Sequence, residues 1–332
     1  MKRLICLILS LMLILSCIPA ALCQQPAPGG ETETPVYSAC SDTKFFIRLE
    51  ADVNSRKVQY VSPHEKIYVY EYGPDWCRIS LRNARGYCKT KWLHRFFPLD
   101  PMVATVPGAM LQAGMARVTM PIRIKTGGYG GNELAEGDVL SVLRWEDGEA
   151  TVNMMRETAS IPAGHLIFTP FVSWRDAKEG DIIGGFTTYY NEETGGSLSR
   201  NRQFNIELVA SRVTGAVVPA GELFSFKALS GETSRKNGYL MAPNISQDGK
   251  GYGGGVCQLT TTLFNAALGL PLKIETWKTH QNSGVSYVPR DFDAAISSYN
   301  DFIFRNLLPY PIRIEALPQH GVLTVIITRA AP

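Results

Sequence analysis

The stretch that decides the fold is GYGGGVCQLTTTLFNAALG, residues 251–269. Its glycine-rich start favours a loop, and Gly269 suits the position just after a helix. Between them, apolar side chains recur with the spacing of one helix face, at Val256, Leu259, Leu263 and Ala267. The pattern predicts a glycine loop that runs directly into a helix, with Cys257 in the first turn.

Cys257 occupies a position where a thiol can act as a nucleophile. Unpaired N–H groups and the helix macrodipole favour negative charge at a helix start, and therefore favour the thiolate. The glycines let backbone N–H groups approach a substrate carbonyl and stabilise an oxyanion, with Gln258 as a further donor. These glycines are Gly253, Gly254 and Gly255. The stretch indicates acyl-transfer chemistry.

A base and a group that orients it are also present downstream. His280 is the only histidine between residues 166 and 319, and Asp293 follows it. Cys257, His280 and Asp293 could form a nucleophile, base and orienting carboxylate. Asp291 and Asp301 are rivals for the third role.

Structural explanations of the same residues stay open. The glycines could serve a tight turn only. Cys257 could be a small buried hydrophobe, or could form a disulfide with Cys40. His280 could cap a loop. The loop could also cradle an anion, although it lacks the Lys-Ser/Thr ending of a phosphate loop.

Composition excludes several classes of protein. The 332 residues are 45% hydrophobic and 19% charged, which excludes a disordered or fibrous chain and allows two or three domains. A net charge of +3 without a long basic run argues against a nucleic-acid partner. We expect no metal and no cofactor, because the five histidines stand alone, at His64, His94, His165, His280 and His320.

The first 23 residues predict an export signal. Lys2 and Arg3 precede an apolar run over residues 4–18 and small residues before position 24, with Ala21 and Cys23 at the cleavage positions. Two alternatives stay open: lipidation at Cys17, or an uncleaved anchor. All three interpretations place the protein outside the cytoplasmic membrane. Only the leader or a lipid anchor would contact the membrane. Residues 24–35 are a Pro/Gly-rich flexible spacer.

Residues 36–97 predict a small β domain. Residues 76–81 and 84–88 flank Arg82-Asn83 with the spacing of a two-residue hairpin, which sets Cys77 opposite Cys88 and makes a disulfide plausible. The runs GPDWCRI (73–79), RGY (85–87) and KWL (91–93) resemble a bacterial SH3-like domain. The resemblance implies a small barrel that holds envelope proteins near peptidoglycan. Residues 98–111 are a linker, and 112–172 form a possible second copy.

Residues 180–330 predict a mixed antiparallel-sheet and helix domain. Residues 201–214 carry one apolar helix face, and residues 310–317 and 322–328 flank a hairpin turn. The fold class is therefore α+β, with one or two small SH3-like barrels before this domain.

The last domain resembles the VanW family, named from vancomycin-resistance gene clusters. The resemblance rests on GGGVCQLTTTLFNA (253–266), on FTTYY (186–190) and on PAGELFSF (219–226). One departure is Asp291, where the family usually has glycine. Further matches are Asn205-Ile206, Gly238-Tyr239, Ala242-Pro243, His280, Tyr287-Val288-Pro289, Asp293-Ala294, Asp301 and Asn306.

The resemblance implies an envelope-associated protein whose family has no established activity. The resemblance and the candidate site residues together lead to two hypotheses about the function. The first is cysteine-dependent acyl transfer, or amidase-like action, on peptidoglycan peptides at Cys257 and His280. The alternative is a non-catalytic protein that binds peptidoglycan or a partner. The binding residues expected in either case are Gly253, Gly254, Gly255, Gln258, Thr261, Thr262, Asn205 and Tyr287.

Overall fold

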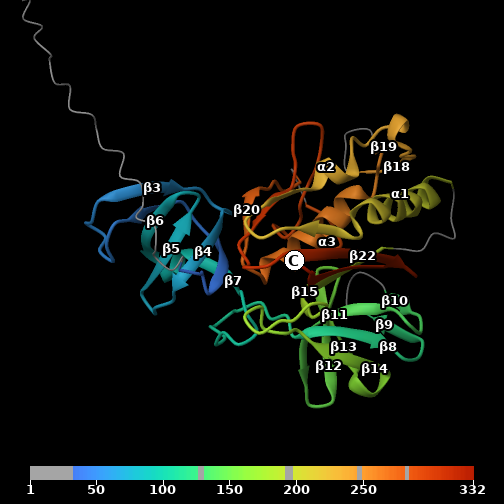
Figure 1. Cartoon of the computed structure of the whole chain (residues 1–332), viewed down its shortest axis with the longest axis horizontal. Helices are drawn as coiled ribbons and strands as arrows, with labels where there is room; N and C mark the ends of the chain where they lie inside the picture. Colours follow the sequence, from blue (N-terminus) through green and yellow to red (C-terminus); the bar gives the residue numbers. More distant parts are fainter. Residues whose placement is uncertain (1–32, 126–130, 191–196, 245–248, 281–283) are drawn as a thin grey trace, which may run out of the picture. The chain divides into compact units, whose positions relative to one another are not determined.

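The computed structural model describes residues 33–125, 131–190, 197–244, 249–280 and 284–332. The predicted leader, with Cys17, Ala21 and Cys23, and most of the predicted spacer lie outside them. Figure 1 shows the chain as a succession of antiparallel sheets with few helices, which agrees with the predicted α+β class. None of the helices in the described ranges has the length and apolar character needed to cross a membrane.

The first sheet has seven antiparallel strands. The hairpin predicted around Arg82-Asn83 is confirmed, because Leu81 pairs with Ala84. The core beneath it is formed by alternating inward side chains such as Ile47, Ile67 and Ile79. In spatial order the strands are β3 (Lys57–Val61), β2 (Phe45–Arg48), β6 (Ala84–Lys89), β5 (Trp76–Leu81), β4 (Lys66–Glu71), β1 (Tyr37–Ser41) and β7 (Leu93–Pro98).

The cysteines of this sheet require a correction. Cys77 does lie directly opposite Cys88, but both are free buried thiols and no disulfide joins them. Sγ of Cys77 instead lies 3.3 Å from the Thr90 hydroxyl, which gives the buried thiol a polar partner. Cys40 and Cys257 are also free, so the disulfide considered between them is absent too.

The second sheet has five strands and is accompanied by a separate two-stranded hairpin. Neither this sheet nor the first closes into a barrel within the described residues, so the SH3-like architecture stays a prediction. Its strands, in spatial order, are β13 (Glu157–Pro162), β12 (Glu149–Met154), β11 (Val139–Glu146), β8 (Gly114–Val118) and β14 (Leu166–Pro170), and the hairpin is β9 (Ile122–Lys125) with β10 (Gly131–Leu134).

The segment predicted as a linker, residues 98–111, has no helix or strand beyond Pro98 but is anchored at Asp100. Asp100 is 1% exposed. Its carboxylate accepts hydrogen bonds from the side chains of Ser173 at 2.7 Å and Arg175 at 2.9 Å. A buried carboxylate paired in this way holds the backbone around it in one place.

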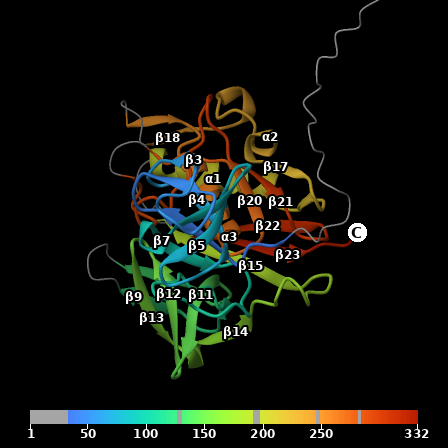
Figure 2. The ribbon, with the colours of Figure 1, turned by 90° about the vertical axis from the view of Figure 1, so that its left-hand side faces the viewer.

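The last part of the chain combines a four-stranded sheet with three helices (Figure 2). The predicted hairpin is confirmed, with its turn at His320-Gly321, where both residues have positive φ. The four strands are β15 (Ile182–Tyr189), β23 (Val322–Arg329), β22 (Ile312–Gln319) and β16 (Ala216–Val218), and the helices are α1 (Ser197–Val213), α2 (Phe226–Ser230) and α3 (Val256–Leu268).

Two small sheets complete this part. They are β17 (Leu223–Ser225) with β21 (Ile303–Asn306) and β20 (Leu272–Thr276), and β18 (Met241–Pro243) with β19 (Lys250–Tyr252). The predicted helical face of α1 is buried, including Ile206 and Val209. The helix predicted after the glycine loop is α3, and it packs against β15 and β23. This packing buries α3 almost entirely and brings its first turn beside the loops that precede β21.

Asn306, at the end of β21, bonds to β16 and to the loop that leads into β22. Its amide donates to the carbonyls of Val218 (3.0 Å) and Tyr310 (2.9 Å), and its carbonyl oxygen accepts the N–H of Leu308 (3.0 Å). Asn306 is fully buried, so each of these backbone groups depends on it for a partner.

We expect Asn306→Ala to destabilise the protein by about 2–4 kcal/mol, because it leaves several buried backbone groups unpaired. Chemical denaturation of the full chain measures the effect. The matched control is Asn83→Ala, at an exposed turn position, which should change stability by less than about 0.5 kcal/mol. Equal losses in the two variants would contradict the role of Asn306.

Candidate functional site

The glycine loop is shaped by close approach and by positive φ. Gly253 and Gly255 have φ of +75° and +106°, values that favour glycine. A Cβ on Gly254 would lie 2.3 Å from the carbonyl oxygen of Pro243, so the loop packs directly on β18. Asn205 holds the loop, because its amide donates to the carbonyls of Leu240 (2.9 Å) and Gly254 (3.1 Å). Asn205 is fully buried and is therefore a support of the loop and no ligand-binding residue.

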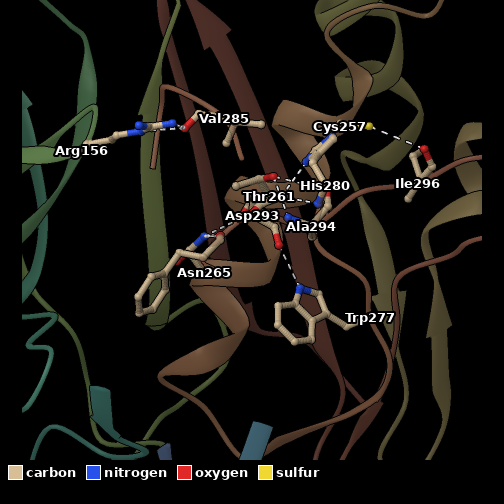
Figure 3. A network of polar contacts seen from close by, with 11 residues as sticks. Arg156, Cys257, Thr261, Asn265, Trp277, His280, Val285, Asp293, Ala294 and Ile296 are labelled. Carbon is tan, nitrogen blue, oxygen red and sulfur yellow. Dashed lines mark hydrogen bonds and ion pairs between the residues drawn. The ribbon is translucent and has the colours of Figure 1, made fainter. Parts of the chain in front are cut away.

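Cys257 is the exception in α3. Twelve of the thirteen helix residues are buried, and Cys257 is the half-buried one. Its Sγ lies 3.7 Å from the carbonyl oxygen of Ile296 (Figure 3). The N–H groups of Val256 and Gln258 donate to Gly253 and Gly255, whereas that of Cys257 bonds to no residue the structure describes. Cys257 therefore carries both the thiol and a backbone N–H that has no partner among the described residues.

His280 connects Cys257 to a buried carboxylate. Nδ1 of His280 lies 2.6 Å from Oδ2 of Asp293, and the backbone N–H of His280 donates to the same oxygen at 2.6 Å. The side chain of Asp293 is 1% exposed and that of His280 is 13% exposed. The side chain of His280 also interacts with that of Cys257, which contributes to its raised pKa. Because Nδ1 is engaged with Asp293, Nε2 is the atom left for the thiol. The structure thus brings the predicted trio together.

The electrostatics of this trio favour a charged imidazole. Burial by itself lowers the pKa of His280, because it disfavours the cation. The interactions with Asp293 and Cys257 favour the cation and outweigh burial, which raises the pKa of His280 from 6.5 to about 9. At neutral pH His280 is therefore an imidazolium held against the carboxylate of Asp293.

The backbone on both sides of the Asp293 side chain is held by Trp277 and Asn265, which the sequence did not single out, and by Thr261. Trp277 Nε1 donates to the carbonyl oxygen of Asp293 at 3.0 Å, and Asn265 donates to that of Phe292 at 2.7 Å. Thr261, which was predicted, accepts the N–H of Ala294 at 3.0 Å. Figure 3 shows these side chains arranged around Asp293. Asn265 lies one helical turn after Thr261, so their spacing on α3 is the signal that could have revealed Asn265.

Gln258 and Thr262 face away from this chemistry. The amide of Gln258 donates to the Thr188 hydroxyl at 3.1 Å and to the Tyr189 carbonyl at 3.0 Å, and its oxygen accepts from Arg202 at 2.6 Å. Thr262 is fully buried and shares a 2.8 Å hydrogen bond with Thr188. Both side chains fasten α3 to β15, which leaves Gln258 no N–H for an oxyanion.

Tyr287 lies close to the thiol. It is 8% exposed, and its phenol interacts electrostatically with Cys257. Burial raises the pKa of Tyr287 strongly, so it stays a neutral phenol. Tyr287 therefore forms part of the wall of the site beside Cys257.

The rival carboxylates serve other purposes. Asp301 accepts from the Ser225 hydroxyl at 2.7 Å and from the backbone N–H of Lys227 at 3.0 Å, at the start of α2. Asp291 has a φ of +67° and pairs with His64 at 3.3 Å. The left-handed φ at Asp291 is one that glycine adopts easily, which fits the departure from the family pattern noted there. Neither carboxylate contacts His280.

The structure offers no set of metal ligands within its described residues, where no three His, Cys, Asp or Glu side chains converge. The histidines other than His280 lie apart from the site. His64 and His320 pair with Asp291 and Asp138, respectively.

Comparison with known proteins supports the resemblance of the last part of the chain to the VanW family. Residues 201–328 match the family described as VanW like protein. The chain is 37% identical over 146 residues to the uncharacterized protein YoaR of Bacillus subtilis (strain 168), a match covering 43% of this chain and 46% of YoaR. The chain thus spans about half the length of that curated relative.

A solved structure, NlpC2 from Trichomonas vaginalis, aligns over 90% of this chain and 98% of its own. The alignment has 10% identity and a TM-score of 0.19, which does not establish a shared fold.

We expect Gly254→Ala to destabilise the protein by about 1–3 kcal/mol, because its new Cβ would collide with the backbone of β18. Thermal and chemical unfolding measure the change. The control is Gly164→Ala, where a Cβ would meet nothing within 4 Å. A Gly254→Ala protein as stable as this control would refute the tight packing of the loop.

The raised pKa of His280 predicts a pH-dependent stability. A pKa of about 9 in the folded state against 6.5 means that protonation stabilises the fold. The contribution, about 2–3 kcal/mol, is fully present below pH 6.5 and is lost as pH rises through 9. His280→Gln should remove this slope from the free energy of unfolding, whereas His165→Gln should keep it. NMR titration of the ring should give the same pKa, and an unchanged slope in His280→Gln would contradict the assignment.

Proposed function

We propose that the VanW-like domain is a cysteine-dependent acyl-transfer enzyme of the amidase type. The observation that carries the proposal is the continuous set of contacts from the Cys257 thiol through His280 to the buried carboxylate of Asp293. In such an arrangement the imidazole takes the proton of the thiol, and the carboxylate orients and stabilises the resulting cation.

The proposed roles follow from the geometry. The reactive form is the pair of Cys257 thiolate and His280 imidazolium, in which the thiol proton has passed to His280. Sγ of Cys257 attacks the carbonyl carbon of an amide, and an S–C bond forms as the oxyanion develops. The N–H of Cys257, at the start of α3, is the donor closest to that oxygen by position. His280, already protonated, gives its proton to the departing amine as the C–N bond breaks. Water or a second amine then releases the acyl group from sulfur, with His280 as the base.

The substrate class we propose is the stem peptides of peptidoglycan. The predicted export signal supports it, because a chain delivered outside the cytoplasmic membrane meets cell-wall peptides. The half-buried state of Cys257 also supports it, since an extended peptide needs the nucleophile at the surface. The first sheet, with its resemblance to SH3-like domains, would then hold the enzyme at the wall.

The test is turnover of purified peptidoglycan fragments by the full-length chain. Mass spectrometry should detect amide cleavage or transfer with the wild-type protein. Cys257→Ala and His280→Ala should each lower the rate at least about 10²-fold, because each removes a group that takes part in bond making. Asp293→Asn should lower the rate and also lower the pKa seen in the pH profile, since the cation loses its partner.

The matched control is His165→Gln, a histidine outside the site, which should keep full activity. Circular dichroism should show that every variant is folded. Full turnover by Cys257→Ala would refute the proposal. Retention on purified peptidoglycan without any turnover would refute catalysis as well, and would favour the non-catalytic binding protein.

A further inference from the structure

A second cysteine, Cys40, lies against the amine of a buried lysine. Cys40 on β1 and Lys66 on β4 are directly paired residues of the first sheet. Nζ of Lys66 lies 2.7 Å from Sγ of Cys40. Cys40 is 2% exposed and Lys66 is 8% exposed, so the contact is inside the protein.

The amine of Lys66 is buried without a carboxylate. Its Nζ lies 5.3, 5.2 and 4.9 Å from the ring centres of Phe264, Trp277 and Phe292, respectively. No acidic side chain in the described ranges forms an ion pair with it. Burial of an ammonium costs free energy unless it is compensated, and three aromatic faces and one thiol are its compensation. A lysine kept in this setting is placed for more than charge pairing.

The separation of the two atoms is short for a hydrogen bond to sulfur. N–H···O bonds span about 2.7–3.2 Å, and sulfur is a larger atom than oxygen. A nitrogen and a sulfur bonded to the same oxygen atom, by contrast, lie this close together. The rotamers of Cys40 and Lys66 are therefore already those that a single bridging oxygen requires.

We infer that Cys40 and Lys66 form an oxidative cross-link, a covalent N–O–S bridge between Nζ and Sγ. The oxidant is hydrogen peroxide, which is small enough to reach a site of this burial. The first equivalent converts the Cys40 thiol to the sulfenic acid and releases one water. The Lys66 ammonium gives one proton to solvent, and the second equivalent joins the sulfenic oxygen to the resulting amine: the N–O bond forms, the O–H and one N–H bond break, and two waters leave. Four electrons pass to peroxide, and one oxygen atom is retained.

The bridge would also change the surroundings of the proposed catalytic carboxylate. It replaces a cation by a neutral group beneath Trp277 and Phe292. Trp277 hydrogen-bonds the carbonyl of Asp293, and Phe292 precedes Asp293 in the chain. The cross-link itself, however, does not depend on any activity of Cys257.

The test is peptide mapping of the full chain after treatment with either peroxide or a phosphine reductant. Trypsin cannot cleave after a bridged Lys66, so the amino-terminal peptide ending at Lys44 should be joined to residues 58–78. The linked species should weigh about 14 Da more than the sum of the two peptides, because one oxygen is gained and two hydrogens are lost. Reductant should return the two separate peptides.

Cys40→Ser and Lys66→Arg should each abolish the linked species, and the arginine variant keeps a cation over the rings. The matched control is Cys77→Ser, which removes another buried thiol of the same sheet and should leave the linked species in place. Peroxide treatment that gives only sulfenic or sulfinic acid on Cys40, with Lys66 cleaved normally, would overturn the inference. So would a disulfide between Cys40 and any other cysteine.

Discussion

The arrangement of the site depends on the burial of one carboxylate, that of Asp293. A charge removed from water is tolerated only where hydrogen bonds and an opposite charge replace the solvent. Here the backbone N–H and the ring of His280 supply that replacement at one oxygen atom. The carboxylate in turn holds Nδ1 of the His280 ring and leaves Nε2 as the nitrogen available to Cys257. Loss of this one contact would leave both the base and the nucleophile without a defined geometry.

The polar side chains of α3 explain how irregular backbone can stay ordered beside the thiol. Residues 277–302 have no helix or strand among those described, so their backbone groups need partners from elsewhere. Thr261 and Asn265 supply them from one face of the helix, while Gln258 fastens the other side to β15. Helix α3 therefore stabilises its surroundings through hydrogen bonds from its polar side chains as well as through its apolar packing. Cys257 alone stays open toward solvent.

Much of the local structure could be predicted from the sequence, because its signals are short in range. Helical spacing after the glycines predicted α3, and the two-residue turn predicted that Cys77 faces Cys88. Register, however, does not set the rotamer of a side chain. The Cys77 thiol turned toward Thr90, and the expected disulfide is absent. The prediction for Gln258 failed for the same reason. Its side-chain amide has the N–H groups that an oxyanion would need, but both donate to Thr188 and Tyr189 in the folded protein.

The sequence by itself determined the order of the elements and the types of residue that could do chemistry: a glycine loop, a cysteine at a helix start, one histidine and several carboxylates. Only the tertiary structure decided that Asp293, and neither Asp291 nor Asp301, lies against His280. It alone placed Lys66 on Cys40 beneath three aromatic rings. The reason is that these contacts join residues 13 or more positions apart in the sequence, and no local periodicity encodes such separations. They arise when packed sheets and helices bury the groups together.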